Sequence, residues 1–373
     1  MKKILIAPDS FKEALSAREV CAAIKDGIKK GDPFSECTLF PLSDGGEGVM
    51  EVLNFHLKGK IRNLEVQDSL GRKIHAQYAL LRDNKTAVIE MAQAAGLQLL
   101  SSAERNPLKT STFGVGQLIE NAIQNGVEKI LLCIGGSATN DAGAGMAAAL
   151  GFKFFDKNGG AISPSGENLA LIESIEKPET DIFKTEIKVR VLCDVENPLY
   201  GPAGAAAVYA PQKGADENAV RILDEGLRHF SKVLKKHFGK DFSNFPGAGA
   251  AGGMGAGAMA FLNAVLCPGI QTIMEMTGFE NALKKTDLVI TGEGKVDAQT
   301  FSGKLVSGVA TLARKYDKPV VVFCGRSTIT PQEMQKMALQ KVISVTPDGM
   351  NLAEALARTK EHLQHAAQKF AAE

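Results

Sequence analysis

The chain has 373 residues with 43 lysines and arginines against 42 aspartates and glutamates, so its net charge is +1 at pH 7. Because nucleic-acid-binding domains usually carry a basic excess, this balance excludes a protein that binds nucleic acid mainly by charge. Hydrophobic residues make up 45% of the chain, which excludes disorder of the whole chain and is enough for a sizeable core.

The first 60 residues predict a β-α-β-α segment. A buried strand is expected over residues 2–8, and Ser16 with Glu19 three residues later forms a capping box at the start of a helix. Gly31 and the proline after it end that helix. A second strand over residues 37–42 runs into a glycine-rich loop that opens the next helix. This order is typical of the start of a parallel sheet.

The pattern changes in the middle of the chain. Residues 61–91 carry short alternating runs, which predict antiparallel hairpins. Further on, the sequence predicts helices over 112–125 and 219–237 and strands over 129–134 and 189–195. A very glycine-rich segment, PGAGAAGGMGAGAM, follows and is assigned no element.

The β-α-β rhythm returns near residue 266. Strands are expected over 287–291, 319–324 and 341–345, with helices over 303–316 and 351–373. The prediction is therefore an α/β fold of two domains. Residues 1–60 plus 266–373 form a doubly wound parallel-sheet domain, flavodoxin- or Rossmann-like, and residues 61–265 form an inserted mixed α/β domain.

The cysteines and the absence of long apolar runs indicate the compartment. No two of the six cysteines form a Cys-x-x-Cys pair, so free thiols in a reducing compartment are expected. The apolar run Ile4–Ala7 is too short for a signal peptide, and no stretch approaches the roughly 18–20 apolar residues of a membrane span. We expect a cytoplasmic protein with no membrane partner.

Polar and glycine residues follow almost every predicted strand, and doubly wound sheets bind ligands at the carboxyl ends of their strands. After the first strand, Asp9, Ser10 and Lys12 offer an acid, a hydroxyl and an ammonium, and Lys12 suits a phosphate. After the second, Asp44 and Glu47 suit magnesium, or one of them suits a general base. The simpler alternatives are a solvated turn and a helix N-terminus whose acids complement its dipole.

The inserted domain carries a second polar set. Gly135 and Gly136 predict a backbone nest, and Ser137, Asn140 and Asp141 beside it suit a carboxylate or phosphate. A glycine turn that packs a helix on a strand would explain the glycines but not the three polar residues together.

Two further polar residues lie at and beyond the end of the next predicted strand. Asp194 stands at the strand end and is a candidate base or metal ligand, and Asn197 comes before a proline turn. A simple cap is the alternative for Asp194.

A third set lies near the C-terminal strands. Glu293 and Asp297 suit a metal or a ribose hydroxyl, while Gly303 and Lys304 open a helix, where phosphates bind favourably. It is not a Walker A motif, because Leu305 follows the lysine. The candidate nucleotide-binding residues are Gly292, Glu293, Gly294, Gln299, Thr300, Gly303 and Lys304.

Taken together and in this order, these motifs resemble the type I glycerate kinase family. The resemblance rests on APDSFKEALSA, PLSDGGEG, IGGSATNDAGAGM, CDVENPLYGPAGAA with APQKGA, GAGAAGGMG and DLVITGEGKVDAQTFSGK, and it covers essentially the whole chain. It implies ATP-dependent phosphorylation of D-glycerate, usually to 2-phosphoglycerate, with Mg²⁺ and an active site in the cleft between two domains.

The chemical type of each candidate side chain predicts its role in phosphoryl transfer. Asp194 is the first candidate for the base and Asp44 the second, while Lys12 and Lys304 neutralise charge on the transferred phosphate. Mg²⁺ is assigned to Asp44, Glu47 and Asp297. Glycerate is assigned to Ser10, Gly135, Gly136, Ser137, Asn140, Asp141 and Asn197.

Several alternatives stay open. The enzyme could phosphorylate another small hydroxy acid, or it could be a phosphatase or mutase that acts on phosphoglycerates. A non-enzymatic protein that binds or senses a small ligand is the alternative from another class. A near-neutral, moderately apolar surface permits a homodimer.

Overall fold

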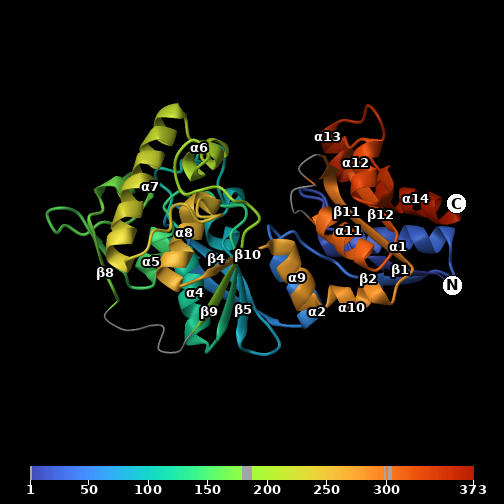
Figure 1. Cartoon of the computed structure of the whole chain (residues 1–373), viewed down its shortest axis with the longest axis horizontal. Coiled ribbons are helices and arrows are strands. Elements are labelled where there is room, and N and C mark those ends of the chain that lie inside the picture. The colour runs from blue at the N-terminus through green and yellow to red at the C-terminus, as the bar shows by residue number, and fades with distance from the viewer. Residues whose placement is uncertain (1, 179–186, 298–299, 301–304) are drawn as a thin grey trace. The chain divides into compact units, whose positions relative to one another are not determined.

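The computed structural model describes residues 2–178, 187–297, 300 and 305–373, which fall into two compact units (Figure 1). Unit 1 contains residues 1–56 and 268–373, so both chain ends belong to it, and unit 2 contains residues 57–267. The sequence analysis expected these divisions at residues 60 and 266.

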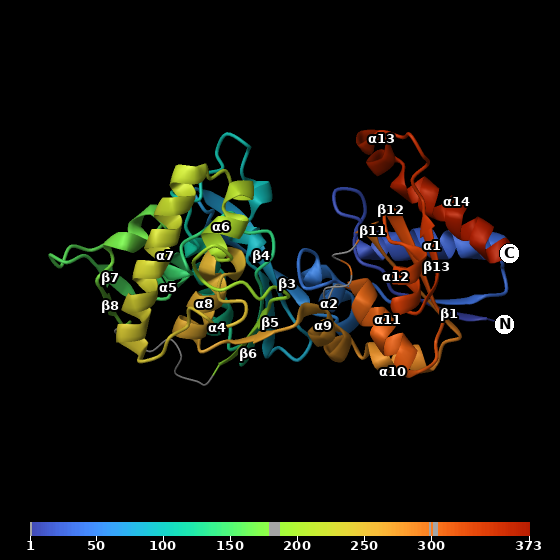
Figure 2. The ribbon, with the colours of Figure 1, turned by 45° about the horizontal axis from the view of Figure 1, so that its top comes forward.

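Unit 1 is built on a five-stranded sheet in the order β13-β12-β11-β1-β2, in which every neighbouring pair is parallel (Figures 1 and 2). The strands are β1 (Lys3–Ile6), β2 (Glu36–Leu39), β11 (Leu288–Val296), β12 (Val320–Ser327) and β13 (Leu339–Ser344). The helices are α1 (Ala17–Gly31), α2 (Val49–Leu57), α9 (Gly269–Thr277), α10 (Phe279–Lys284), α11 (Leu305–Lys315), α12 (Pro331–Lys336), α13 (Leu352–Ala357) and α14 (Thr359–Ala372).

Side chains of β1 are buried on both faces of this sheet. Ile4 and Ile6 share a core with α1 and α14, while Leu5 between them is buried on the opposite face because successive side chains alternate. Burial on both faces is what a doubly wound sheet requires, so the predicted fold class is confirmed. The predicted capping box is also present, since Ser16 and Glu19 each accept a hydrogen bond from the other's backbone N–H.

The C-terminal segment differs from the prediction of one long helix over 351–373. It forms α13 and α14, which are separated at Arg358, where the backbone leaves the helical conformation. The break allows α14 to run along α1 (Figure 2). The two helices approach so closely that a Cβ on Gly27 would lie 2.3 Å from the carbonyl oxygen of Gln364. A glycine is therefore required there.

Unit 2 is built on a six-stranded mixed sheet in the order β10-β9-β6-β5-β4-β3. Strands β5, β6, β9 and β10 are parallel, whereas β3-β4 and β4-β5 are the predicted antiparallel hairpins. The strands are β3 (Lys60–Gln67), β4 (Lys73–Leu80), β5 (Thr86–Glu90), β6 (Lys129–Cys133), β9 (Lys188–Leu192) and β10 (Val265–Cys267), with a separate pair β7 (Lys153–Phe155) and β8 (Ser174–Glu176).

The helices of unit 2 include one that the sequence analysis left unassigned. They are α3 (Ala92–Ala95), α4 (Phe113–Gln124), α5 (Ala144–Ala149), α6 (Ala205–Tyr209), α7 (Glu217–Phe238) and α8 (Ala250–Leu262), with short 3₁₀ turns η1 (Leu97–Leu99), η2 (Gly166–Leu171) and η3 (Pro211–Lys213). The glycine-rich segment forms α8, although three residues near its start, Ala251, Gly252 and Gly253, are left-handed. Almost all of α8 is buried, which compensates for its poor helix propensity.

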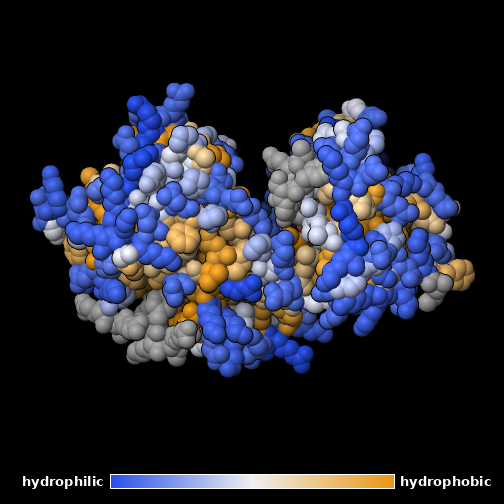
Figure 3. Space-filling view, viewed as in Figure 1, coloured by the Kyte–Doolittle hydropathy of each residue, from blue (hydrophilic) through white to orange (hydrophobic). Residues whose placement is uncertain are grey.

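All six cysteines are free thiols, as the sequence predicted. In the part of the chain that the structure describes, no helix combines the length and apolar character needed to cross a bilayer. The visible surface of both units is mainly hydrophilic (Figure 3).

Candidate active site

In unit 1, Asp9 lies at the carboxyl end of β1 and is 7% exposed. Its position is fixed by three hydrogen bonds. One carboxylate oxygen accepts from the backbone N–H of Ser10 (2.7 Å) and from its hydroxyl (3.3 Å), and the other accepts from the backbone N–H of Asp44 (3.2 Å). The backbone N–H of Asp9 donates to the carbonyl of Gly292 on β11 (2.8 Å). Residues after β1 and β2 thus meet β11 at this edge.

The charges around Asp9 are mostly negative. Burial, and then repulsion from the carboxylates of Asp44 and Glu293, raise the pKa of Asp9 well above its ordinary 3.8, and the ammonium of Lys12 opposes this shift. Buried carboxylates that repel one another create a position at which a cation is stabilised.

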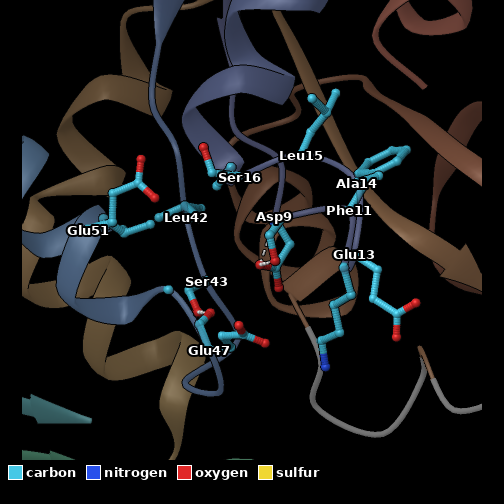
Figure 4. A pocket seen from close by; sticks show the side chains of 15 residues that line it. Asp9, Phe11, Glu13, Ala14, Leu15, Ser16, Leu42, Ser43, Glu47 and Glu51 are labelled. Atoms are coloured by element: carbon cyan, nitrogen blue, oxygen red, sulfur yellow. Dashed lines mark hydrogen bonds between the residues drawn. The ribbon is translucent and has the colours of Figure 1, made fainter. Parts of the chain in front are cut away.

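A pocket of about 280 Å³ opens beside Asp9. Figure 4 shows Asp9 near its centre, with Ser43 and Glu47 across from it and Glu51 further along. Lys12 lines the same pocket and is exposed. The predicted pair Asp44 and Glu47 therefore lies close to Asp9, as the loop after β2 folds toward the loop after β1.

The end of β11 supplies Glu293, whose carboxylate accepts a hydrogen bond from the buried hydroxyl of Thr300 (2.8 Å). The same hydroxyl accepts from the backbone N–H of Asp297 (3.1 Å), so it links the two predicted acids. Asp297 forms an ion pair with Lys295 (2.9 Å). The predicted nucleotide-binding residues Gln299, Gly303 and Lys304 lie outside the described residues.

The acidic set suits Mg²⁺ by its chemistry. Over residues 2–178, 187–297, 300 and 305–373, no group of three or more His, Cys, Asp or Glu side chains is arranged to hold a metal ion. Mg²⁺, however, usually takes only one or two carboxylates together with waters and substrate phosphates. Asp9 and Asp44, adjacent and mutually repelling, are such a pair.

In unit 2, the segment after β6 is held from two sides. The backbone N–H of Ala138 donates to the carbonyl of Ala95 (2.8 Å), and the carbonyl of Gly136 accepts from the backbone N–H of Leu97 (2.9 Å). Gly136 has φ +72°, a conformation that glycine adopts at little cost. Ser137 is 5% exposed, and residues 137–141 are all buried, whereas Gly136 is exposed.

Asp141, predicted to bind substrate, is fully buried and anchors this loop. Its carboxylate accepts hydrogen bonds from the backbone N–H and the hydroxyl of Thr112 (2.7 and 2.8 Å) and from the backbone N–H groups of Gly143 and Gly145 (3.2 Å each). Burial raises the pKa of Asp141 while these bonds favour its charged form. The structure thus ties the loop to the start of α4.

The left-handed start of α8 packs against the same loop. The carbonyl of Gly252 accepts from the backbone N–H of Ala142 (3.0 Å), and a Cβ on Gly252 would lie 2.0 Å from the carbonyl oxygen of Thr139. The glycine-rich motif therefore allows two backbones to approach closely. It follows loop residues, whereas the G-x-G-x-x-G turn of a dinucleotide-binding fold follows a strand.

Asn140 is completely buried, and neither its amide oxygen nor its amide nitrogen has a hydrogen-bond partner in the described part of the chain. Leaving a buried amide unpaired costs about 1–3 kcal/mol per group, so such groups usually mark a missing partner. A bound carboxylate would accept from the amide nitrogen.

Asp194 and Asn197 follow β9, the strand beside β6. Leu192 pairs in register with Cys133, so Asp194 and Gly135 each stand two residues beyond a paired position at the same edge. Asp194 is exposed. Asn197 is not free, because its amide donates to the carbonyl of Ala203 (2.8 Å) and accepts from the hydroxyl of Tyr209 (2.5 Å).

Two residues stand out in the structure that the sequence analysis placed in motifs but gave no role in the site. Asp9 is the first polar residue after β1. Lys213 lies in the APQKGA motif, and its ammonium is buried against Ser137 and Thr139. Nothing in the local sequence around Lys213 indicates that contact, since about 75 residues separate the partners.

The chain was compared with known proteins. A family model described as the glycerate kinase family matches residues 4–373. A protein of Halalkalibacterium halodurans named glycerate kinase is 43% identical over 371 residues, which cover 100% of this chain and 98% of that protein. A protein of Escherichia coli K12 named glycerate 2-kinase is 42% identical over 370 residues, which cover 99% and 97%.

A solved structure is similar over the same length. The crystal structure of a protein from Salmonella typhimurium LT2, assigned as a glycerate kinase 2, has a TM-score of 0.87 and 41% identity to this chain, and the match covers 100% of this chain and 97% of that one.

Proposed function

We propose that this chain, which belongs to the glycerate kinase family, transfers the γ-phosphoryl group of ATP to D-glycerate and forms 2-phosphoglycerate. Membership in the family makes it a phosphotransferase whose acceptor is an alcohol group. The choice of position 2 is supported by the name of the E. coli relative, glycerate 2-kinase. A place in the cytoplasm is part of the same proposal.

The observation that carries the choice of substrate class is the polar loop after β6. A small hydroxy acid offers a carboxylate, and this loop combines a buried hydroxyl with an unpaired buried amide in one short stretch. We assign the carboxylate to Ser137, Asn140 and the backbone of Gly135 and Gly136. Asp141 and Asn197 hold their loops in place, since their side chains are already hydrogen-bonded.

Asp194 is the proposed base. It is exposed and lies on the same unit and the same sheet edge as the proposed carboxylate-binding loop. In the step it assists, the substrate hydroxyl gives its proton to Asp194 and its oxygen bonds to the γ-phosphorus, while the bond from phosphorus to the bridging oxygen breaks and ADP leaves.

The phosphates of ATP are assigned to unit 1. Lys12 supplies a positive charge beside the pocket and Ser10 a hydroxyl, and Gly292 and Gly294 of β11 are assigned to the same nucleotide. The Glu293–Thr300 pair is the proposed contact to the nucleotide. Mg²⁺, when bound, neutralises phosphate charge. Asp44 with Asp9 would hold it, with Glu47 beside them and Asp297 near β11.

The proposal is tested by incubating the purified protein with D-glycerate, ATP and MgCl₂ and following the product by phosphorus NMR. A 2-phosphoglycerate signal with matching ADP release is expected. A 3-phosphoglycerate signal would refute the position, and turnover of glycerol as fast as of glycerate would refute recognition of a carboxylate. Absence of any phosphorylated product would refute D-glycerate as the substrate.

A further inference from the structure

Lys213 is an unusual lysine because its side chain is almost completely buried. It ends the 3₁₀ turn η3 in unit 2 and is 2% exposed. Lysines are rarely buried to this extent unless their charge is compensated. Burial lowers the pKa of Lys213 to about 7, with the charge of Asp141 opposing the shift. Folding stability alone gives no reason to place an amine here.

The two hydrogen-bond partners of this amine are neutral oxygens. Its Nζ donates to the hydroxyl oxygen of Ser137 (2.8 Å) and to the backbone carbonyl of Thr139 (2.7 Å). Both acceptors belong to the loop that we assign to the substrate carboxylate. The amine of Lys213 therefore ends within this loop, between the Ser137 hydroxyl and the carbonyl of Thr139, the residue before Asn140.

The direction of the Ser137 bond follows from the chemistry of the groups. An ammonium has three donors and no acceptor, whereas a hydroxyl has one donor and two acceptor lone pairs. Ser137 must therefore accept from Lys213 when the lysine is charged, and its own hydrogen is left to donate to another group. A neighbouring positive charge also makes that hydroxyl a stronger donor to an anion.

The unpaired amide of Asn140 independently indicates that a ligand is expected here. Asn140 is completely buried and lies three residues after Ser137 in the sequence. Among the described residues, neither its amide nitrogen nor its amide oxygen has a hydrogen-bond partner. A buried carboxylate next to both residues would accept from the serine hydroxyl and from the amide nitrogen.

We propose that Lys213 is a positioning residue that orients the Ser137 hydroxyl as a hydrogen-bond donor to the carboxylate of the substrate, and so selects hydroxy acids over uncharged polyols. This inference rests on the proposed function. Lys213 acts through Ser137, and its charge offsets the charge that the bound carboxylate brings into a buried site.

The first test replaces the amine by an apolar side chain of similar length, Lys213→Met, and measures the kinetics for each substrate separately. The KM for D-glycerate should rise about tenfold or more, while the KM for ATP stays within about twofold and kcat within about threefold. Lys188→Met, an exposed lysine at the start of β9, is the matched control and should change neither KM. An unchanged glycerate KM in Lys213→Met, or equal increases in both KM values, would overturn the proposal.

A second set of variants separates positioning from direct contact. In Ser137→Ala, the glycerate KM should rise as much as in Lys213→Met, and the double variant should be no worse than Ser137→Ala alone. Multiplying effects in the double variant would mean that Lys213 itself holds the substrate, which contradicts a role through Ser137. If Lys213→Met does not fold, Ser137→Ala still decides, because an unchanged glycerate KM there also overturns the proposal.

The wild-type assay distinguishes this proposal from the one on which it rests. No turnover of D-glycerate by the wild-type enzyme would refute the substrate, and the role of Lys213 with it. Turnover by the wild-type enzyme with unaltered variants would refute the role of Lys213 alone.

Discussion

The sheets of the two units carry buried titratable groups of opposite kind near the carboxyl ends of their parallel strands. In unit 1 a buried aspartate, Asp9, stands near two more carboxylates, whereas in unit 2 a buried lysine, Lys213, contacts neutral oxygens. Burial raises the pKa of the acid and lowers that of the amine to about 7, since it disfavours the charged form of either. The same physical cause thus produces opposite shifts in the two units.

This difference indicates what each edge is suited to bind. A set of repelling carboxylates is relieved by a cation, and a buried amine beside an unpaired amide is relieved by an anion. Mg²⁺ with its nucleotide suits the first edge, and the carboxylate of a hydroxy acid suits the second. The predictions below test this division, starting with the one of largest expected effect.

The largest effect is expected at the proposed base. Asp194→Asn should lower kcat by about 10²–10⁴-fold, because proton acceptance by a positioned side chain contributes about that much, and should leave the glycerate KM nearly unchanged. The rate of ADP release measures kcat. Glu196→Gln, at an exposed acid two residues away, is the control and should leave kcat unchanged. A kcat within threefold of the wild type would move the base elsewhere, with Asp44 the next candidate.

The acidic edge is tested by its dependence on Mg²⁺. Asp44→Asn should raise the Mg²⁺ concentration that gives half-maximal activity by on the order of tenfold, since a carboxylate that attracts the ion is lost. Glu51→Gln changes an exposed acid that lines the same pocket and should leave this concentration unaltered. If Asp44→Asn and the wild type reach half-maximal activity at the same Mg²⁺ concentration, Asp44 does not bind the ion.

The loop of unit 2 is tested through its anchor. Thr112→Val removes the hydroxyl that donates to Asp141 and that accepts from the backbone N–H of Met146 (2.8 Å each). Leaving these buried groups unpaired should cost about 1–3 kcal/mol of unfolding free energy, measured by urea denaturation. Thr328→Val, at an exposed threonine, should cost less than about 0.5 kcal/mol. Equal losses in the two variants would show that Asp141 does not depend on Thr112.

The smallest effect concerns stability against pH in unit 1. Between the ordinary aspartate pKa of 3.8 and the raised pKa of folded Asp9, the folded protein keeps a proton that the unfolded chain has released. The contribution of Asp9 is therefore complete below pH 3.8 and is lost as the pH rises through the raised pKa.

Asp9→Asn removes this dependence, so its Tm at pH 8 should exceed that of the wild type by about 2–4 °C, the shift that about 1 kcal/mol produces in a domain of this size. Thermal melts from pH 4 to pH 8 measure it, and Asp348→Asn, an exposed aspartate of unit 1, should follow the wild type. A wild-type Tm that rises with pH in step with Asp9→Asn would contradict the prediction.

Local patterns predicted much of the fold. The capping box at Ser16 and Glu19, the parallel β-α order of both chain ends and the hairpins after residue 60 all depend on residues close together in sequence. The polar residues after each strand were recognised for the same reason, because strand ends and glycine turns have local signatures.

Other features depended on contacts that no local pattern contains. The glycine-rich segment was left without an element because glycine disfavours helices, yet it forms α8 since burial against the loop at Thr139 outweighs propensity. The single C-terminal helix predicted for residues 351–373 is broken at Arg358 so that α14 can pack along α1.

The sequence by itself determined which strand ends carry chemistry and, through its motifs, the family. Only the tertiary structure decided which of those groups lie together and how deeply each is buried. Asp9 lies among other carboxylates because the loops after β1 and β2 meet β11 there, and Lys213 contacts the loop after β6 because a 3₁₀ turn far along the chain buries its amine there. Burial and charge are properties of the surroundings of a side chain, and those surroundings come from distant residues.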